Sequence, residues 1–315
     1  MSAHLALVAC LDETRSVHTV TFKRAISLFQ QYRRQHGMAD APITCYDDQA
    51  DAETAARVAH EIVVDAPRAV IGHFASAAAA AAAPIYAQAG MPLLLPAATA
   101  RALTRHATTY RICAHDDAYI AALRVFCASR QLRIARLEHD GSVHGRSIAR
   151  ALQGGGADHD ANQDADQGAN HGAPGPACVV FSGTCQRAIA FLAGQGETDV
   201  PVVLTDDALC QEIVAPAQAY RGEVYIVGLA PAATGETARW LEQAYRRQFG
   251  APPGTYFWET IAAIEVALAS GAERLDAQAW DTVLGPLRFD AEREAGINGF
   301  ASYRVDGTGL LEIAA

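Results

Sequence analysis

The sequence is short of positive charge, and this shortage limits the partners that the protein is expected to have. It contains 25 Lys and Arg against 35 Asp and Glu, which gives a formal net charge of −10 at pH 7. Nucleic acids and anionic membrane surfaces are bound mainly through Lys and Arg side chains that neutralise phosphates. The composition therefore disfavours both, and we expect no nucleic-acid partner.

Long hydrophobic runs are also missing. The longest uncharged apolar stretch, Phe74–Ala100, is mostly alanine and is interrupted by three prolines, so we expect no direct insertion into a membrane. The N-terminus has no basic segment, and its apolar run Leu5–Leu11 is followed at once by two acidic residues, unlike a secretory leader. The sequence as written predicts a cytoplasmic protein, or a periplasmic one if an upstream leader is missing.

The cysteines lack the spacing of a disulfide framework or a zinc site. They are odd in number, scattered along the chain and never arranged as C-x-x-C, which predicts reduced and mostly buried thiols. The seven positions are Cys10, Cys45, Cys113, Cys127, Cys178, Cys185 and Cys210.

Catalytic motifs are lacking as well. The pair His60-Glu61 has no second histidine at the spacing of a zinc-protease helix, and no Gly-x-Ser-x-Gly elbow or phosphate-binding glycine loop occurs. We therefore expect a protein that is not an enzyme, with no cofactor and no metal ion.

What the sequence does have is enough apolar material for two cores and a regular alternation of strands and helices. Half of the 315 residues are hydrophobic, and this length suits two domains. Short apolar runs alternate with segments of helical periodicity, which predicts parallel sheets with helices on both faces. In the first part we predict strands at Leu5–Cys10, Ile43–Tyr46, Ala69–Ile71 and Pro92–Leu95, and helices at Phe22–Tyr32, Ala52–Val64 and Ala77–Gln88.

The same alternation resumes after Cys113, with one interruption. Residues 154–176 have no periodicity and almost no large apolar side chain, which is typical of a loosely packed loop. Elsewhere we predict strands at Leu132–Leu137, Cys178–Phe181, Val202–Leu204 and Val224–Val227, helices at Tyr119–Ser129, Gly145–Leu152, Gln186–Ala193, Thr237–Phe249 and Trp258–Ala269, and a strand-rich segment from Leu287 to Ile313.

Two hydroxyl side chains follow predicted strands, at the sheet edge where open α/β folds bind ligands. Ser76 comes after Ala69–Ile71 and Thr99 after Pro92–Leu95, each where a helix is expected to begin. Hydroxyls beside free backbone N–H groups at a helix start form a receptor for a small carboxylate. The alternative is that both residues are only N-caps of the helices that follow.

These segments resemble a known family. Val70–Ser76 (VIGHFAS), Pro92–Ala100 (PLLLPAATA) and Tyr46-Asp47-Asp48 are similar to the leucine/isoleucine/valine-binding proteins, the substrate-binding receptors of branched-chain amino acid ABC transporters. The similarity returns at Tyr256-Phe257-Trp258 and at Leu284–Leu287.

The resemblance implies the type I periplasmic binding fold. That fold is α/β, with two doubly wound parallel-sheet lobes joined by a hinge. The implied N-terminal lobe spans 1–114 plus 230–297, and the implied C-terminal lobe spans 115–229 plus 298–315. Because the low-complexity segment 154–176 stands in the place of a strand and a helix, the second lobe is possibly trimmed.

In the first lobe, the resemblance implies a site for the charged ends of an amino acid. Ser76 and Thr99 hold the ligand carboxylate with their backbone N–H groups. The carbonyl of Ala97 and the hydroxyl of Thr99 accept from the ligand ammonium. Ala98 lies between them in the same segment, and Phe74 packs beneath the ligand.

The other residues of the implied site match the family pattern less well. Asp206 falls where the family places an acid that pairs with the ammonium, although Asp207 or a plain helix-capping role are alternatives. Tyr256 falls near an aromatic residue of the side-chain pocket, with ordinary core packing as its alternative. His144 and Thr184 stand where the family usually has tyrosines, so the implied pocket has lost aromatic walls.

A further departure concerns the disulfide that is common in the family's first lobe. Its two positions fall near Ala50 and Ala75, and their joint replacement fits a reducing compartment.

Three functions remain open from the sequence. The first is the substrate-binding component of an amino acid transporter, which closes two lobes on an amino acid zwitterion and has an ABC transporter permease as partner. The second is a cytoplasmic sensor of the same fold that binds an amino acid or amide and acts on a regulatory protein. The third is a degenerate paralogue that binds nothing.

Overall fold

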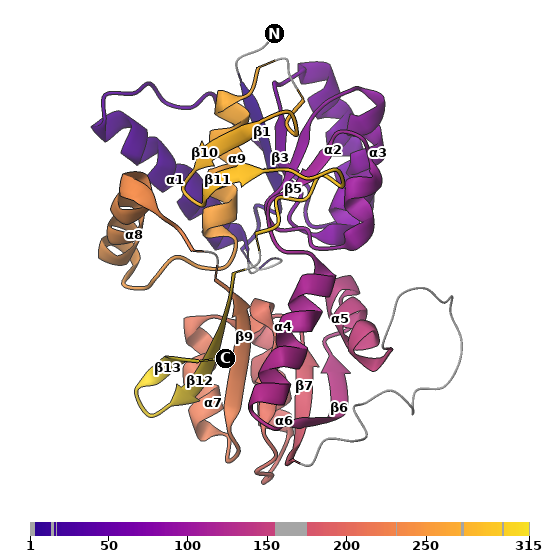
Figure 1. The fold of residues 1–315 in the computed structure, drawn as a ribbon, viewed down its shortest axis with the longest axis vertical. Helices are drawn as coiled ribbons and strands as arrows, with labels where there is room; N and C mark the ends of the chain where they lie inside the picture. The colour runs from indigo at the N-terminus through magenta and orange to yellow at the C-terminus, as the bar shows by residue number, and fades with distance from the viewer. Residues whose placement is uncertain are drawn as a thin grey trace. The chain divides into compact units, whose positions relative to one another are not determined.

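The computed structural model describes residues 4–13, 16, 18–154, 175–230, 232–271, 274–297 and 299–314. The chain divides into two compact units (Figure 1). Unit 1 comprises residues 1–115 and 231–299, and unit 2 comprises residues 116–230 and 300–315. Each unit is therefore built from two separate parts of the chain.

Unit 1 contains a five-stranded parallel sheet in the order β2-β1-β3-β4-β5. Its strands are β1 (Leu5–Ala9), β2 (Ile43–Asp47), β3 (Val70–Gly72), β4 (Leu93–Leu95) and β5 (Thr109–Arg111), and an antiparallel hairpin adds β10 (Ala279–Thr282) and β11 (Gly285–Arg288). Its helices are α1 (Thr19–Gln35), α2 (Ala52–Asp65), α3 (Ser76–Gln88), the 3₁₀ turn η1 (Arg101–Arg105), α8 (Gly235–Phe249) and α9 (Phe257–Ala269).

Unit 2 contains a six-stranded sheet in the order β13-β12-β9-β8-β7-β6. The strands β6 (Arg133–His139), β7 (Ala177–Ser182), β8 (Val202–Leu204) and β9 (Val224–Leu229) are parallel, and β12 (Phe300–Asp306) and β13 (Gly309–Ile313) join them antiparallel. Its helices are α4 (Asp116–Ser129), α5 (Val143–Gln153), α6 (Cys185–Gly194) and α7 (Val214–Ala219), with the 3₁₀ turns η2 (Asp206–Ala208) and η3 (Gln211–Ile213).

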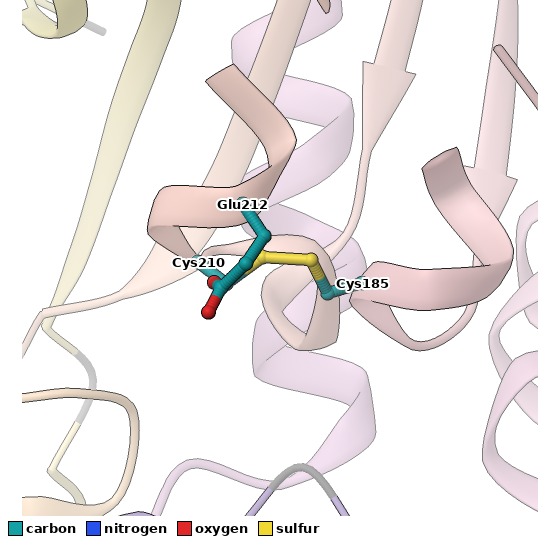
Figure 2. Close-up of side chains that lie close together, drawn as sticks. All are labelled: Cys185, Cys210 and Glu212. Carbon is teal, nitrogen blue, oxygen red and sulfur yellow. A yellow bond between two sulfur atoms is a disulfide. The ribbon is translucent and has the colours of Figure 1, made fainter. Parts of the chain in front are cut away.

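The cysteine prediction is wrong for one pair in unit 2. Cys185, the first residue of α6, and Cys210, just before η3, form a disulfide across 25 residues of sequence (Figure 2). No motif marks this pair in the sequence, because the fold of unit 2 brings the starts of two separate helical segments together. The other five cysteines are not disulfide-bonded, and of these Cys45 alone is exposed.

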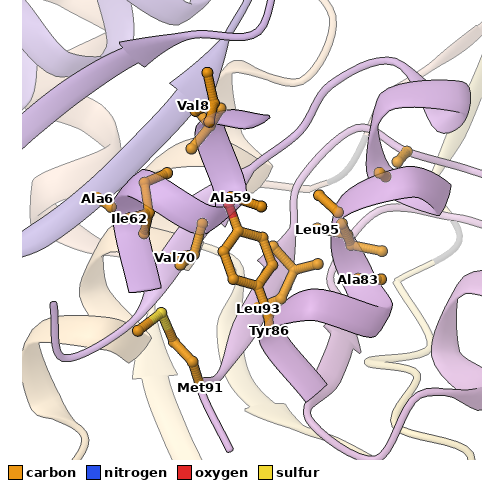
Figure 3. Close-up of a cluster of buried hydrophobic side chains, with 14 of the residues drawn as sticks. Ala6, Val8, Ala59, Ile62, Val70, Ala83, Tyr86, Met91, Leu93 and Leu95 are labelled. Atoms are coloured by element: carbon orange, nitrogen blue, oxygen red, sulfur yellow. The ribbon is translucent and has the colours of Figure 1, made fainter. Parts of the chain in front are cut away.

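The core of unit 1 explains why its strands are continuous apolar runs. On one face of the sheet, Ala6, Val8 and Val70 pack with residues of α2 and α3 around the fully buried ring of Tyr86 (Figure 3). Figure 1 shows α1 and α9 on the other face of this sheet. With both faces covered, successive residues of a strand are all buried, which removes the polar alternation of a half-exposed strand.

The observed architecture matches the predicted alternation, with a few elements that the patterns did not predict. β5 was missed because it has only three residues and reads Thr-Tyr-Arg. α7 was missed because it has six residues with a proline inside, and β10 begins before the predicted strand-rich segment. Most of the predicted loop 154–176, and with it the possible trimming of the second lobe, lies outside the described residues. Within the described ranges, no helix is long and apolar enough to cross a membrane.

Candidate functional site

One group of predicted site residues lies in unit 1, where β3 and β4 end. β3 ends at Gly72, whose φ is +126° and whose hypothetical Cβ would lie 1.9 Å from the carbonyl oxygen of Val8. Only glycine fits here, because any side chain would collide with the backbone of β1. Gly72 therefore allows the backbone to turn directly after β3, into the loop that contains His73 and Phe74 and leads to Ser76.

Ser76 and the segment after β4 come together as the sequence predicted, but neither hydroxyl residue is an N-cap. The N-cap residues of α3 and η1 are Ala75 and Ala100, and neither makes a side-chain capping bond. The hydroxyl of Ser76 instead accepts a hydrogen bond from the backbone N–H of Ala100 at 3.4 Å. This contact links the loop after β3 to the loop after β4, which contains the buried residues Ala97, Ala98 and Thr99. Ser76 is therefore the first residue of α3, and Thr99 lies two residues before η1.

An aromatic cluster lies in the same unit. The ring of Phe74 packs edge-on against Phe22 at 5.3 Å between centroids and lies 6.5 Å from Tyr256. The imidazole of His18 lies 5.0 Å from the Tyr256 ring and 6.3 Å from Phe74. Tyr256 is buried and has a left-handed backbone, with φ of +67°. It therefore packs with Phe74 and His18, and His18 is a residue that the sequence patterns did not single out.

A buried polar chain supports the loop after β3. His73 Nδ1 lies 2.8 Å from a carboxylate oxygen of Asp48, and His73 Nε2 lies 3.1 Å from the hydroxyl of Tyr86. All three side chains are almost completely buried. The other carboxylate oxygen of Asp48 accepts from the backbone N–H of Ala50. Because buried polar groups are costly when they lose a partner, this chain fixes the residue directly before Phe74.

Another group of predicted site residues lies in unit 2, where a histidine lies between two acids. His144 Nε2 is 3.5 Å from Asp206 Oδ1, and His144 Nδ1 is 3.8 Å from Asp116 Oδ1. Asp206 is 1% exposed and starts η2 directly after β8 and Thr205. Asp116 is the first residue of α4, and His144 is the second residue of α5. Three helical starts therefore bring these side chains together.

This environment changes the protonation of His144. Burial acts to lower the pKa of the imidazole, but the interaction with Asp206, and the charges of Asp207 and Asp116, raise it to about 10. The imidazole is consequently protonated near pH 7, and its charge is balanced by the two nearest carboxylates.

Tyr119 of α4 contacts the backbone of Asp206 and so helps to hold this residue in place. Its hydroxyl accepts a hydrogen bond from the N–H of Asp206 at 2.8 Å and donates to the carbonyl of Val227 at 2.5 Å. Burial raises the pKa of this hydroxyl well above its usual value, so it stays protonated. Neither Tyr119 nor Asp116 carries a sequence motif, and only the fold shows their place beside Asp206.

Thr184 is the N-cap residue of α6, and its backbone contacts Asp140. The backbone N–H of Thr184 donates to Asp140 Oδ2 at 3.1 Å, and Oδ1 of the same carboxylate accepts from Ser142 at 2.9 Å. Ser142 in turn caps α5 by accepting from Gly145. A Cβ at Gly183 would meet the Asp140 side chain at 2.6 Å. Asp140 therefore ties the starts of α5 and α6 to the end of β6, which the sequence patterns did not predict.

Comparison with known proteins supports the predicted fold and the predicted resemblance to the leucine/isoleucine/valine-binding proteins. The periplasmic binding protein family model matches residues 29–162. The Leu/Ile/Val-binding protein of Escherichia coli (strain K12) is 35% identical over 126 residues, which cover 38% of this chain and 34% of that protein. The resemblance predicted from the sequence is confirmed.

Other relatives extend the similarity to both units. The leucine-specific-binding protein of Salmonella typhimurium is 25% identical over 302 residues, covering 84% of this chain and 80% of that protein. The branched-chain amino acid transporter substrate binding protein of Streptococcus pneumoniae, solved with isoleucine, superposes with a TM-score of 0.74 at 17% identity, over 99% of this chain and 100% of the other. The predicted type I periplasmic binding fold is confirmed. The chain is thus similar to the substrate-binding proteins of amino acid transport, although its match to the E. coli protein spans about a third of that protein's length.

Proposed function

We propose that the protein is the non-catalytic substrate-binding component of an ABC transporter for an amino acid of the branched-chain type. The observation that carries the proposal is the hydrogen bond from the backbone N–H of Ala100 to the Ser76 hydroxyl in unit 1, directly after the buried segment Ala97–Thr99. Ser76 is the first residue of α3, and a hydroxyl at a helix start suits a small carboxylate. Neither residue stands at the N-cap position of α3 or η1, so the alternative that both are only N-caps has less support.

The other groups have complementary roles in this proposal. The Ala97 carbonyl and the Thr99 hydroxyl accept from the ligand ammonium, and Phe74 and Tyr256 supply apolar surface. In unit 2, Asp206 supplies the acid for the ammonium, and His144 and Thr184 occupy the positions of the missing aromatic residues. Removing a zwitterion from water is costly unless each charged end gains directed partners, and these groups supply both kinds. The partner is the permease of the transporter.

Calorimetric titration against the twenty amino acids tests the proposal. We expect heat and a thermal shift with at least one aliphatic amino acid. The double substitution Ser76→Ala/Thr99→Ala should weaken that binding by about 100-fold, because each hydroxyl contributes roughly 1–2 kcal/mol. The matched control is Ser129→Ala/Thr237→Ala, which removes hydroxyls of ordinary hydrogen bonds elsewhere. Unchanged binding by the Ser76/Thr99 variant would refute the assigned site.

The sensor alternative has lost part of its support. It rested in part on the absence of a first-lobe cysteine pair, but unit 2 contains a bonded pair of its own. Cell fractionation separates the two functions: a periplasmic pool favours transport, and a purely cytoplasmic pool favours a sensor. If no amino acid or amide gives a signal, the degenerate paralogue becomes the better description.

A further inference from the structure

A second cluster of reactive side chains lies in unit 2, apart from the residues assigned to the amino acid ligand. Glu212 lies beside the Cys185–Cys210 disulfide, and one ligand atom from each of the three residues falls within 4.8 Å of the other two (Figure 2). Two sulfurs and a carboxylate oxygen form a donor set that zinc prefers in proteins. Among the described residues, this is the one such group of three.

The backbone around the cluster suits a metal site as well as a disulfide. The Cα atoms of Cys185 and Cys210 are 6.4 Å apart, near the long end of the range of disulfides. Two thiolates on one zinc ion lie about 3.8 Å apart, since each Zn–S bond is about 2.3 Å in tetrahedral geometry. With this Cα separation, rotation of the side chains is enough to open the sulfurs to that distance. Cys185 is anchored in the apolar cluster of α6, so it stays in place after reduction.

The helix dipole at Cys185 and the access of solvent to the cluster also favour metal binding by the reduced cysteines. Cys185 is the first residue of the ten-residue helix α6, where the helix dipole stabilises a thiolate. Cys210 is half-buried and Glu212 is exposed, so solvent reaches one side of the cluster. A small dithiol and a metal ion can approach from that side.

We propose that Cys185, Cys210 and Glu212 form a zinc site that is available when the disulfide is reduced and blocked when it is oxidised. A dithiol reductant supplies two electrons and two protons: the S–S bond breaks, each cysteine sulfur gains a proton, and the reductant closes its own disulfide. Zn²⁺ then replaces the two thiol protons, which are released to solvent. The two thiolates and the Glu212 carboxylate bind the ion, and water fills the fourth position.

Metal binding by the full-length protein tests the proposal. The protein is reduced with a dithiol, freed of reductant by gel filtration without oxygen, and titrated with Zn²⁺ against a chromogenic indicator. We expect one tightly held zinc ion per reduced chain and none above background in the oxidised chain. Titration with Co²⁺ should give thiolate-to-metal charge-transfer absorption in the reduced chain.

Matched variants identify the ligands. Cys185→Ser and Cys210→Ser should each abolish the tight zinc ion, whereas Cys45→Ser, which removes an exposed free thiol, should retain it. Glu212→Gln keeps both cysteines and should weaken zinc binding by about tenfold or more, since it removes one of three protein ligands. Glu197→Gln, at an exposed acid of the same unit, is its control.

Two results would overturn the inference. One is a reduced protein that holds no more zinc than Cys185→Ser, which would leave a structural disulfide alone. The other is unchanged affinity in Glu212→Gln, which would remove the carboxylate from the site. Neither result bears on amino acid binding, so this inference and the proposed transport function fail independently.

Discussion

At the scale of single residues, the most informative position is His144. A tyrosine is usual here in the family that the sequence resembles, yet this histidine lies between Asp116 and Asp206 and is protonated near pH 7. Asp206, assigned to the ligand ammonium, therefore already has a cation nearby. The exchange of a tyrosine for a protonated histidine changes both the size and the charge of the side chain at this position.

The first prediction concerns the pH dependence that His144 creates. Its pKa is raised from 6.5 to about 10 in the folded protein, so its stabilising effect is complete below pH 6.5 and is lost as the pH rises through 10. His144→Gln should cost roughly 3 kcal/mol near pH 7, because it leaves buried acids without their cation, and this cost should shrink toward pH 10. Urea unfolding at several pH values measures it. Exposed His60→Gln is the control, and a pH-independent cost would contradict the assignment.

The second prediction concerns Glu259 of α9, a fully buried acid. Burial raises its pKa from 4.5 to about 8, and its Oε2 has no hydrogen-bond partner in the described part of the chain. The folded state holds this proton more tightly than the unfolded state, so stability falls by up to about 1.4 kcal/mol per pH unit between pH 4.5 and 8.

The test of this second prediction is Glu259→Gln. The variant should lose that slope and become more stable than the wild type above pH 8, as measured by denaturant unfolding from pH 5 to 9. Exposed Glu236→Gln in α8 should leave the slope in place. A parallel pH profile for Glu259→Gln and the wild type would show that this acid titrates normally.

At the scale of elements, the ends of β3 and β4 position the predicted site residues of unit 1. The third prediction is that Gly72→Ala destabilises the protein by at least about 3 kcal/mol, because its Cβ would overlap the backbone of β1 and its φ is +126°. Gly194→Ala is the matched control: it ends α6 in open space and should be neutral or slightly stabilising. Thermal unfolding compares the two. Equal effects would mean that β3 tolerates a shift away from β1.

The fourth prediction concerns how the loop after β3 is held. Tyr86→Phe removes the hydroxyl next to His73 and should cost about 1–2 kcal/mol of stability and also weaken ligand binding, because Phe74 and Ser76 follow His73 directly. Tyr32→Phe removes a hydroxyl that accepts from Thr237 and should lower stability without changing affinity. Calorimetry separates these outcomes. If both variants bind equally well, the polar chain supports the core and not the site.

Some of the helices, strands and site residues could be predicted from the sequence, and others could not. The long, periodic helices and the fully apolar strands could be predicted from the sequence, because a strand covered on both faces leaves a clear run of apolar residues. β5 and α7 could not, because three or six residues carry too little pattern. The contact between Ser76 and the segment after β4 could be predicted, because the carboxyl ends of neighbouring parallel strands lie at the same edge of a sheet. The places of Asp116, Tyr119 and His18 could not, because these residues come from distant segments without any motif.

At the scale of the whole molecule, the chain forms two units with separate cores, and the disulfide belongs to one of them. The Cys185–Cys210 bond closes a 25-residue loop, so its reduction should destabilise unit 2 by about 3 kcal/mol in the chain-entropy account. The loop contains α6 and β8, which lie in the core of that unit.

The fifth prediction follows from this placement. Hydrogen exchange measured without added zinc should rise on reduction in α6, β8 and η3, and should stay unchanged in α2 and α3 of unit 1. Cys185→Ser should show the higher exchange without any reductant. A rise of equal size in both units would show that they unfold as a single cooperative structure.

The order of the chain within unit 2 has a consequence for its synthesis. β12 pairs with β9 and β13 pairs with β12, so residues 300–313, which are made after the other four strands of this sheet, supply two of its six strands. Unit 1 also waits for α8, α9 and the β10–β11 hairpin, which follow nearly all of unit 2 in the sequence. The sheet of unit 2 therefore keeps an open edge at β9 until residues 300–313 have been made. A truncated product that stops before residue 300 should aggregate instead of accumulating as a stable fragment.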